Sequence, residues 1–264
     1  DHRDLHSFPT RRSSDLYELT STGWFLVGLS AVLVGLSKTG IPGLGILMTP
    51  LMAMAFPLEY LRESTGILLG MLILGDLFAA GYYRQHAEWG YVLRLLPPAF
   101  AGIVAGWLAM GHVSDAQLQR IIGVIILGML AVNYWRTRLQ GENAPIPSQW
   151  WFGPLMGFIA GITTMMANAA GPVMVIYLLA MRLPKFAFIG TSAWFFFVVN
   201  WLKVPFSANL NLINAMSLKL DLMMLPLIAL GAVAGILFLR KVPQKIFNDT
   251  VQILAAAAAV KLLF

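Results

Sequence analysis

The stretch GLSKTGIPGLG, residues 35–45, interrupts a long apolar run with glycines, a proline, two hydroxyls and the charged Lys38. Glycine and proline break helices, and a broken helix leaves backbone N–H and C=O groups that hydrocarbon cannot satisfy. A charge at membrane depth costs at least about 2.5 kcal/mol on insertion scales. A membrane protein tolerates such a stretch only where it faces protein or a wet cavity. We therefore interpret residues 35–45 as half of a substrate site.

The composition around this stretch is that of a membrane protein. The chain has 264 residues, of which 58% are hydrophobic and only 11% charged, and its mean hydropathy is +0.74. A soluble domain is nearer half apolar and a quarter charged, so we predict an all-α integral membrane protein embedded in a lipid bilayer. The apolar segments that form or approach spanning helices lie at residues 22–37, 43–56, 64–83, 92–111, 118–135, 150–166, 171–181, 186–202, 221–239 and 249–263.

Charge and motif content exclude several classes of protein. The formal charge of +6 comes from lysines and arginines scattered singly through short loops, whereas a nucleic-acid-binding surface clusters them. The chain has no cysteine, and its four histidines do not cluster, so we predict neither a disulfide nor a metal site. P-loop, HExxH and GxSxG motifs are missing. We therefore expect no enzyme, no cofactor and no nucleic-acid partner.

The two halves of the chain resemble each other. GIVAGWL at residues 102–108 matches GAVAGIL at residues 231–237 in five of seven places. The other matches are Pro57 with Pro184, Ser64 and Thr65 with Thr191 and Ser192, and Pro98 with Pro226, all at offsets between 127 and 129 residues. This duplication places residues 35–45 opposite a second broken stretch, GITTMMANAAGP at residues 161–172.

The duplication defines the predicted domain organisation. Residues 17–137 form a first membrane repeat and residues 150–264 a second, with a polar linker at 138–149 between them. Residues 1–16 are polar and aperiodic, and we expect them to be either foreign sequence or a disordered tail. We predict about eight transmembrane helices, with each repeat opening in a broken helix or hairpin.

The length of the first broken segment favours hairpins. As one helix, residues 22–56 would span about 52 Å at 1.5 Å per residue, against a hydrocarbon core of about 30 Å. With hairpins, each repeat has an odd number of crossings, so the repeats are inverted and positive charge is biased to one face. Nine cations share that face, namely Arg84, Arg94, Arg136, Arg138, Arg182, Lys185, Arg240, Lys241 and Lys245, and five share the other, namely Arg62, Arg120, Lys203, Lys219 and Lys261.

Paired helix breaks at matching positions of two repeats indicate a transporter binding site near the bilayer midplane. A half-helix that starts after a break points unpaired N–H groups and a partial positive charge at that site, which favours an anion. The alternative is that the glycines only allow close packing and the hydroxyls bond to their own helices. The candidate residues are Ser37, Lys38, Thr39, Gly40, Gly43 and Gly45 in the first break and Thr163, Thr164, Asn168 and Gly171 in the second.

Two further groups of polar residues lie inside apolar segments. Thr191, Ser192 and Asn200 stand at helical spacing in one segment, and they either line the substrate path or only pack. Asp76 lies inside another, as either a proton-coupling carboxylate or the partner of a buried cation. In the repeat alignment Asp76 falls opposite Lys203, so an ion pair between them is one expectation. Lys38 itself is either a site residue or a lysine that reaches the interface.

The same motifs resemble those of the sulfite exporter TauE/SafE family of membrane permeases. The resemblance rests on GLSKTGIPGLG followed by Pro50, and on GITTMMANAAGP with YLLA, LPK and GTSAWFFFVVNWLKVP, and it covers about residues 22–263. Many members have successive glycines where this chain spaces them at Gly40, Gly43 and Gly45. The resemblance implies a multi-pass protein of the bacterial inner membrane and substrates such as sulfite, sulfonates or sulfoacetate.

We therefore predict a secondary transporter, exporter or permease of a small anion. One alternative is an anion channel, in which the same breaks form a fixed filter. Another is a non-transporting membrane scaffold, although a scaffold gives no reason to keep polar groups in lipid. The sequence leaves open the substrate, the direction of transport, the coupling ion, and whether the protein is a monomer or a homo-oligomer.

Overall fold

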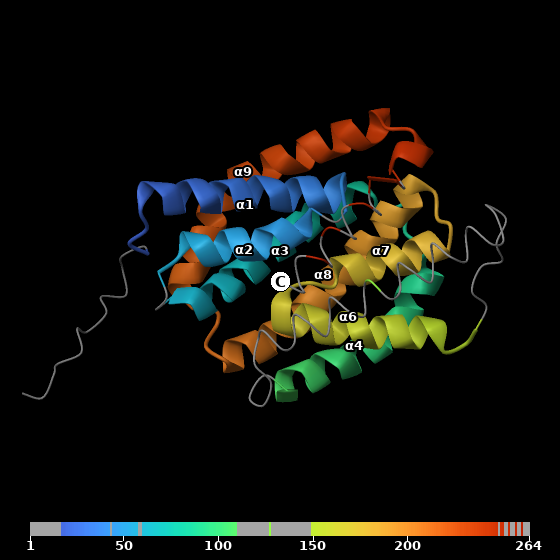
Figure 1. The fold of residues 1–264 in the computed structure, drawn as a ribbon, viewed down its shortest axis with the longest axis horizontal. Coiled ribbons are helices and arrows are strands. Elements are labelled where there is room, and N and C mark those ends of the chain that lie inside the picture. Colours follow the sequence, from blue (N-terminus) through green and yellow to red (C-terminus); the bar gives the residue numbers. More distant parts are fainter. Residues whose placement is uncertain are drawn as a thin grey trace, which may run out of the picture.

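The computed structural model is helical throughout the residues it describes, namely 17–42, 44–57, 60–109, 127, 149–247, 249–250, 253, 257 and 260 (Figure 1). The tail at 1–16, Gly43, nearly all of the expected segments 118–135 and 249–263, and nearly all of the linker 138–149 lie outside them. The helices are α1 (Ser21–Thr39), α2 (Gly45–Ala55), α3 (Leu61–Tyr82), α4 (Trp89–Ala109), α6 (Phe152–Ala167), α7 (Gly171–Ala180), α8 (Lys185–Asn209) and α9 (Ala215–Lys241).

Five of the described helices are long and apolar enough to cross a membrane: α1, α3, α4, α8 and α9. Two shorter apolar helices, α6 and α7, accompany them. The prediction of a helical membrane protein is therefore confirmed at this level.

Two helices extend well beyond the apolar segments expected from the sequence. Helix α8 continues through Lys203 and Pro205 to Asn209, and α9 starts at Ala215 behind a capping box formed by Asn214 and Ser217. The polar residues in these extensions hid them in a hydropathy reading. Lys203, which the sequence placed on a loop, is instead buried inside α8.

The chain reverses direction at each break. Near the start of α1, a Cβ built on Gly23 would lie 2.7 Å from the carbonyl oxygen of Ala55, the last residue of α2. In the second half, the Phe152 ring at the start of α6 lies 5.7 Å from the Tyr177 ring in α7. Figure 1 shows α1 and α2 lying side by side, with α1 and α6 running in opposite directions. Each broken segment is thus a helical hairpin.

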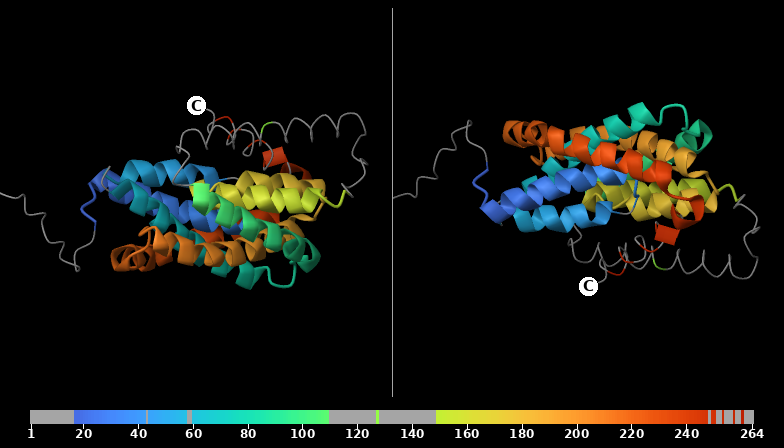
Figure 2. Two further views of the ribbon diagram at one scale, coloured as in Figure 1. Left: turned by 90° about the horizontal axis from the view of Figure 1, so that it is seen from below. Right: turned by 90° about the horizontal axis from the view of Figure 1, so that it is seen from above.

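The halves of the chain exchange helices. The two most extensive helix pairs are α1 with α9 and α4 with α6, and each joins the first helix of one half to the last described helix of the other (Figure 2). Glycine permits both contacts, since a Cβ on Gly35 would lie 2.0 Å from the oxygen of Ile228 and one on Gly161 2.0 Å from that of Ala99. Close backbone approach at small residues is how membrane helices pack.

This exchange produces two main hydrophobic cores. One is formed by α1, α2, α3 and α9, and includes Val34, Met52, Met71 and Ile228. The other is formed mainly by α4, α6, α7 and α8, with Ile103 among its buried residues. Helices α3 and α8 also pack on each other, and the candidate site lies where the two cores meet.

Candidate functional site

The end of α1 is fixed against α9 by Thr39 and Gly40. The Thr39 hydroxyl lies 2.9 Å from the oxygen of Gly35 and 2.8 Å from that of Ala232, and Tyr83 donates to the Thr39 carbonyl at 2.8 Å. A Cβ on Gly40 would lie 2.4 Å from the Gly235 oxygen. Thr39 and Gly40 therefore fit the packing alternative: the Thr39 hydroxyl bonds to backbone carbonyls, and Gly40 allows close contact with α9.

The second break is formed by a left-handed residue. Asn168 has φ 51° at the end of α6, and its N–H bonds to the Thr164 carbonyl at 3.1 Å. The next N–H, of Ala169, bonds to Thr163 at 3.2 Å. The last carbonyls of α6 are therefore capped, and asparagine is one of the few non-glycine residues that adopts this conformation readily.

The two short helices begin with open N-termini. Neither α2 nor α7 has a side chain that caps its first N–H groups. A Cβ on Gly171 would meet nothing within 4 Å, and one on Gly45 would meet only Ser37 Oγ at 3.6 Å. Packing does not require glycine at either position, in contrast to Gly40. Both helix starts face open space without a side-chain cap, which is the arrangement that favours an anion, although Pro172, the second residue of α7, has no N–H to donate.

That open space is one cavity lined by both halves of the chain. The centres of water molecules have about 60 Å³ available in it, room for a few waters or one small oxyanion, since one water needs roughly 10–15 Å³. Its apolar wall includes Leu72, Val175 and Phe196. The predicted site residues that line it are Ser37, Lys38, Gly45, Thr164, Asn168, Gly171, Ser192 and Asn200.

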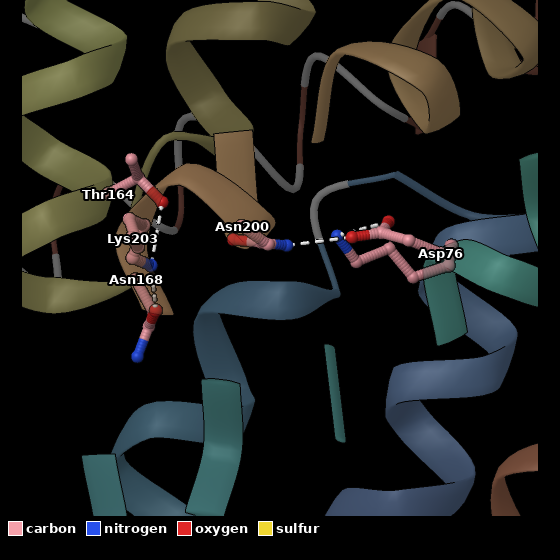
Figure 3. Close-up of polar contacts among 6 residues, drawn as sticks. Asp76, Thr164, Asn168, Asn200 and Lys203 are labelled. Atoms are coloured by element: carbon pink, nitrogen blue, oxygen red, sulfur yellow. Dashed lines mark hydrogen bonds and ion pairs between the residues drawn. The ribbon is translucent and has the colours of Figure 1, made fainter. Parts of the chain in front are cut away.

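Behind one side of the cavity lies a buried ion pair. Lys38 Nζ is 2.7 Å from Asp76 Oδ1, and the two side chains are 11% and 0% exposed. Asn200 of α8 donates to Asp76 Oδ2 at 2.7 Å (Figure 3), and the Lys38 ammonium lies 4.4 Å from the centre of the Phe196 ring. A buried carboxylate requires such partners, and here they come from α1 and α8.

On the other side, Lys203 reaches the second break. Its Nζ donates to Thr164 Oγ1 at 3.1 Å and to Asn168 Oδ1 at 2.5 Å, and the residue is 1% exposed. Figure 3 shows Lys203 between these two side chains, while Asn200 points to Asp76. The expected ion pair between Asp76 and Lys203 is therefore wrong: Asp76 pairs with Lys38, and Lys203 is held by neutral oxygen atoms.

Several predicted site residues lie away from the cavity wall. The Thr163 hydroxyl bonds within its own helix to the Ala160 carbonyl at 3.1 Å. Thr191 accepts a hydrogen bond at 3.0 Å from the N–H of Glu88, in the connection before α4. Thr39 and Gly40 contact α9, as described above. Gly43 lies outside the described residues.

Two buried charged residues, Lys203 and Asp221, are not among the predicted site residues. Asp221 is 4% exposed, its Oδ1 has no hydrogen-bond partner, and its Oδ2 would lie 1.8 Å from a Cβ on Gly70. Both residues stand at the ends of apolar runs, where a hydropathy reading stops. The available signal is helical spacing, because Lys203 is three residues from Asn200 and Asp221 is three from Met224, each on a buried face.

A protein-family model described as Sulfite exporter TauE/SafE matches residues 24–262 of the chain. No curated protein and no solved structure matches it. The matched stretch contains both breaks, the whole cavity lining and all the described helices except the first three residues of α1. Within the described part of the chain, no group of three or more acidic or histidine side chains could hold a metal ion.

Proposed function

This chain belongs to the sulfite exporter TauE/SafE family, and from that premise we propose that it carries a small sulfur oxyanion through the membrane. The substrate, in this proposal, binds in the cavity between the two helix breaks. Sulfite and organic sulfonates are the substrates that we propose first. The oxygen atoms of both need hydrogen-bond donors and positive charge.

The observation that carries the proposal is the convergence of the two breaks. The first residues of α2 and α7, Gly45 and Gly171, line the same cavity from different halves of the chain. Lys38 and Asn200 line it between them. Four carbonyls near the ends of α1 and α6, those of Leu36, Thr39, Thr163 and Thr164, already have partners, so fewer acceptors are left to face this space. Such a lining binds an anion in preference to a cation or an apolar molecule.

We further propose that the chain consists of two inverted repeats, residues 17–137 and 150–264, that move relative to each other around the bound anion. The exchange of α9 and α4 between the two cores and the opposite directions of α1 and α6 support this arrangement. Rocking of inverted repeats about a site at their interface is a general way to expose that site alternately to the two sides. About eight crossings and a bacterial inner-membrane location complete the proposal.

The test is flux in proteoliposomes that contain the purified protein. We expect saturable uptake of labelled sulfite or of an alkanesulfonate, and weaker uptake of acetate and other carboxylates. If no sulfur oxyanion moves, the proposed substrate class is wrong. If flux does not saturate and appears as unitary currents driven by voltage, the protein is an anion channel instead.

A matched pair of glycine variants locates the path. In Gly171→Leu the new side chain enters the cavity, whereas in Gly81→Leu it meets nothing within 4 Å on the exposed side of α3. We expect Gly171→Leu to lower uptake at least about tenfold, because it removes the space next to the α7 donors. Gly81→Leu should transport like the wild type. Equal uptake by the two variants would place the substrate path elsewhere.

A further inference from the structure

Three ionisable side chains surround the cavity, and their charges do not cancel. Lys38 and Asp76 neutralise each other at 2.7 Å. Lys203 is 1% exposed, and among the described residues no carboxylate lies within ion-pair distance of it. Lys203 interacts electrostatically with both Lys38 and Asp76, so the three form one cluster. With both lysines protonated and Asp76 ionised, this cluster carries one positive charge.

No other described group supplies the missing negative charge. Asp221, the other buried acid, has no electrostatic interaction with either lysine, and it contacts α3 at Gly70, about 9 Å along the helix from Asp76. The ends of α2 and α7 add hydrogen-bond donors but no net charge, since each helix carries a positive and a negative end. The Lys203 ammonium donates hydrogen bonds to Thr164 and Asn168, and both of these residues line the cavity.

We infer that this site selects oxyanions by charge: it takes singly charged species, such as a monosulfonate or hydrogen sulfite, and rejects doubly charged ones, including the sulfoacetate dianion that the family resemblance suggested. This inference rests on the proposed function and adds its charge specificity. A buried charge without a partner is costly in a membrane. A monoanion in the cavity brings the cluster to zero, whereas a dianion leaves one uncompensated negative charge.

In this account, Asp76 and Lys203 are specificity-determining residues. Asp76 cancels Lys38, so that only one cation remains to be matched by substrate. Lys203 supplies that cation through the hydrogen bonds that hold it against the cavity wall. Removing either charged group changes the net charge of the cluster by one unit. The charge of the preferred ligand should then change by one unit in the opposite sense.

The first experiment uses wild-type protein in proteoliposomes and measures uptake of labelled methanesulfonate. Propane-1-sulfonate and ethane-1,2-disulfonate, which are similar in length, compete as unlabelled ligands. We expect the monosulfonate to compete at least about tenfold better. At the effective dielectric constant of protein, the interaction energy of two unit charges several ångströms apart corresponds to a difference in affinity of more than about tenfold. Equal competition would overturn the inference while leaving the proposed function in place. No uptake of any sulfonate or sulfite would defeat the proposed function itself.

Charge variants provide the second experiment. Lys203→Met brings the empty cluster to zero and should lower methanesulfonate uptake at least about tenfold, whereas Lys203→Arg keeps the charge and should retain most of the uptake. Asp76→Asn raises the cluster to two positive charges and should reverse the preference toward the disulfonate. The double variant Asp76→Asn with Lys203→Met restores one positive charge and should restore the preference for the monosulfonate.

Folding is controlled separately. If the Asp76 variants elute as aggregates from a sizing column, Asn168→Asp replaces them, since it brings the cluster to zero while both lysines and the side-chain size remain. It should lower methanesulfonate uptake as Lys203→Met does. Folded charge variants that all keep the wild-type preference would refute the inference, because charge would then not decide selection.

Discussion

Two buried aspartates in the apolar helices have opposite electrostatic surroundings. Asp76 has a lysine at 2.7 Å and an amide at 2.7 Å. Asp221 has neither, and one of its oxygens lacks any hydrogen-bond partner. A carboxyl group without a cation is stable at membrane depth only when it carries its proton. The two residues are chemically identical, but only Asp76 has a cation beside it.

This contrast predicts different effects of the same substitution. Asp221→Asn exchanges one neutral group for another of equal size and should change the free energy of unfolding by less than about 1 kcal/mol. Asp76→Asn leaves Lys38 buried without a counter-charge and should cost about 3 kcal/mol or more. Thermal unfolding of the purified variants in detergent measures both. Equal losses of stability would mean that Asp221 is ionised in the folded protein.

The ion pair also changes how Lys38 should be tested. As the only charge in the first break, Lys38 looked like the residue that meets the substrate. The structure gives it a second task, neutralising Asp76, so loss of activity in Lys38→Ala would report both roles at once. Lys203, whose partners are neutral oxygens, separates substrate charge from ion-pair stability more cleanly.

At the scale of elements, glycines determine which helices can meet. A Cβ on Gly231 would lie 2.0 Å from the oxygen and 2.9 Å from the carbon of the Val32 carbonyl, so α1 and α9 are in backbone contact there. The last turn of α1, which carries Ser37 and Lys38, comes directly after this contact along the helix. The position of the first break in the cavity therefore depends on a glycine that touches no substrate.

Gly231→Val should separate the two helices and lower the free energy of unfolding by at least about 1–3 kcal/mol, as overpacking does. The control is Gly90→Val, since a Cβ on Gly90 in the first turn of α4 meets nothing within 4 Å. Unfolding temperatures in detergent compare the two variants. A Gly231→Val protein as stable as Gly90→Val would contradict the tight α1–α9 contact.

At the scale of the whole molecule, more of the described cations lie at one end than at the other, where Arg62 and Lys219 stand near the starts of α3 and α9. Arg84, Arg182, Lys185 and Lys241 follow or precede the ends of α3, α7, α8 and α9 that lie together in Figure 1. The start of α1 lies at the opposite end. From the positive-inside rule we predict that the starts of α6 and α8 lie in the cytoplasm and the start of α1 outside.

Cysteine labelling tests this orientation, since the chain has no cysteine of its own. Ser21→Cys, at the exposed start of α1, should react in intact cells with a maleimide that cannot cross the membrane. Gln149→Cys, just before the start of α6, and Lys245→Cys, just after the end of α9, are exposed and should react only after the membrane is opened. Labelling of all three from one side would contradict the inverted arrangement.

The sequence by itself predicted the helical membrane class, the family, and two broken stretches that mark a site. Hydropathy and the helix-breaking effect of glycine and proline depend only on residues that are close in the sequence. They can therefore be recognised without the tertiary structure. The parts of α8 and α9 around Lys203 and Asp221 could not be read in this way, because a charged residue inside a helix resembles a loop residue until its buried surroundings are known.

Only the tertiary structure decided which polar groups meet. It turned Thr39, Gly40, Thr163 and Thr191 away from the cavity and brought Lys38 to Asp76. Apart from the bonds of Thr39 to Gly35 and of Thr163 to Ala160, those contacts join residues on different elements, and their energies depend on distances and burial that no local pattern contains. The stretch at residues 35–45 predicted where a site would lie, and packing between α1, α3, α8 and α9 determined which charged groups meet there.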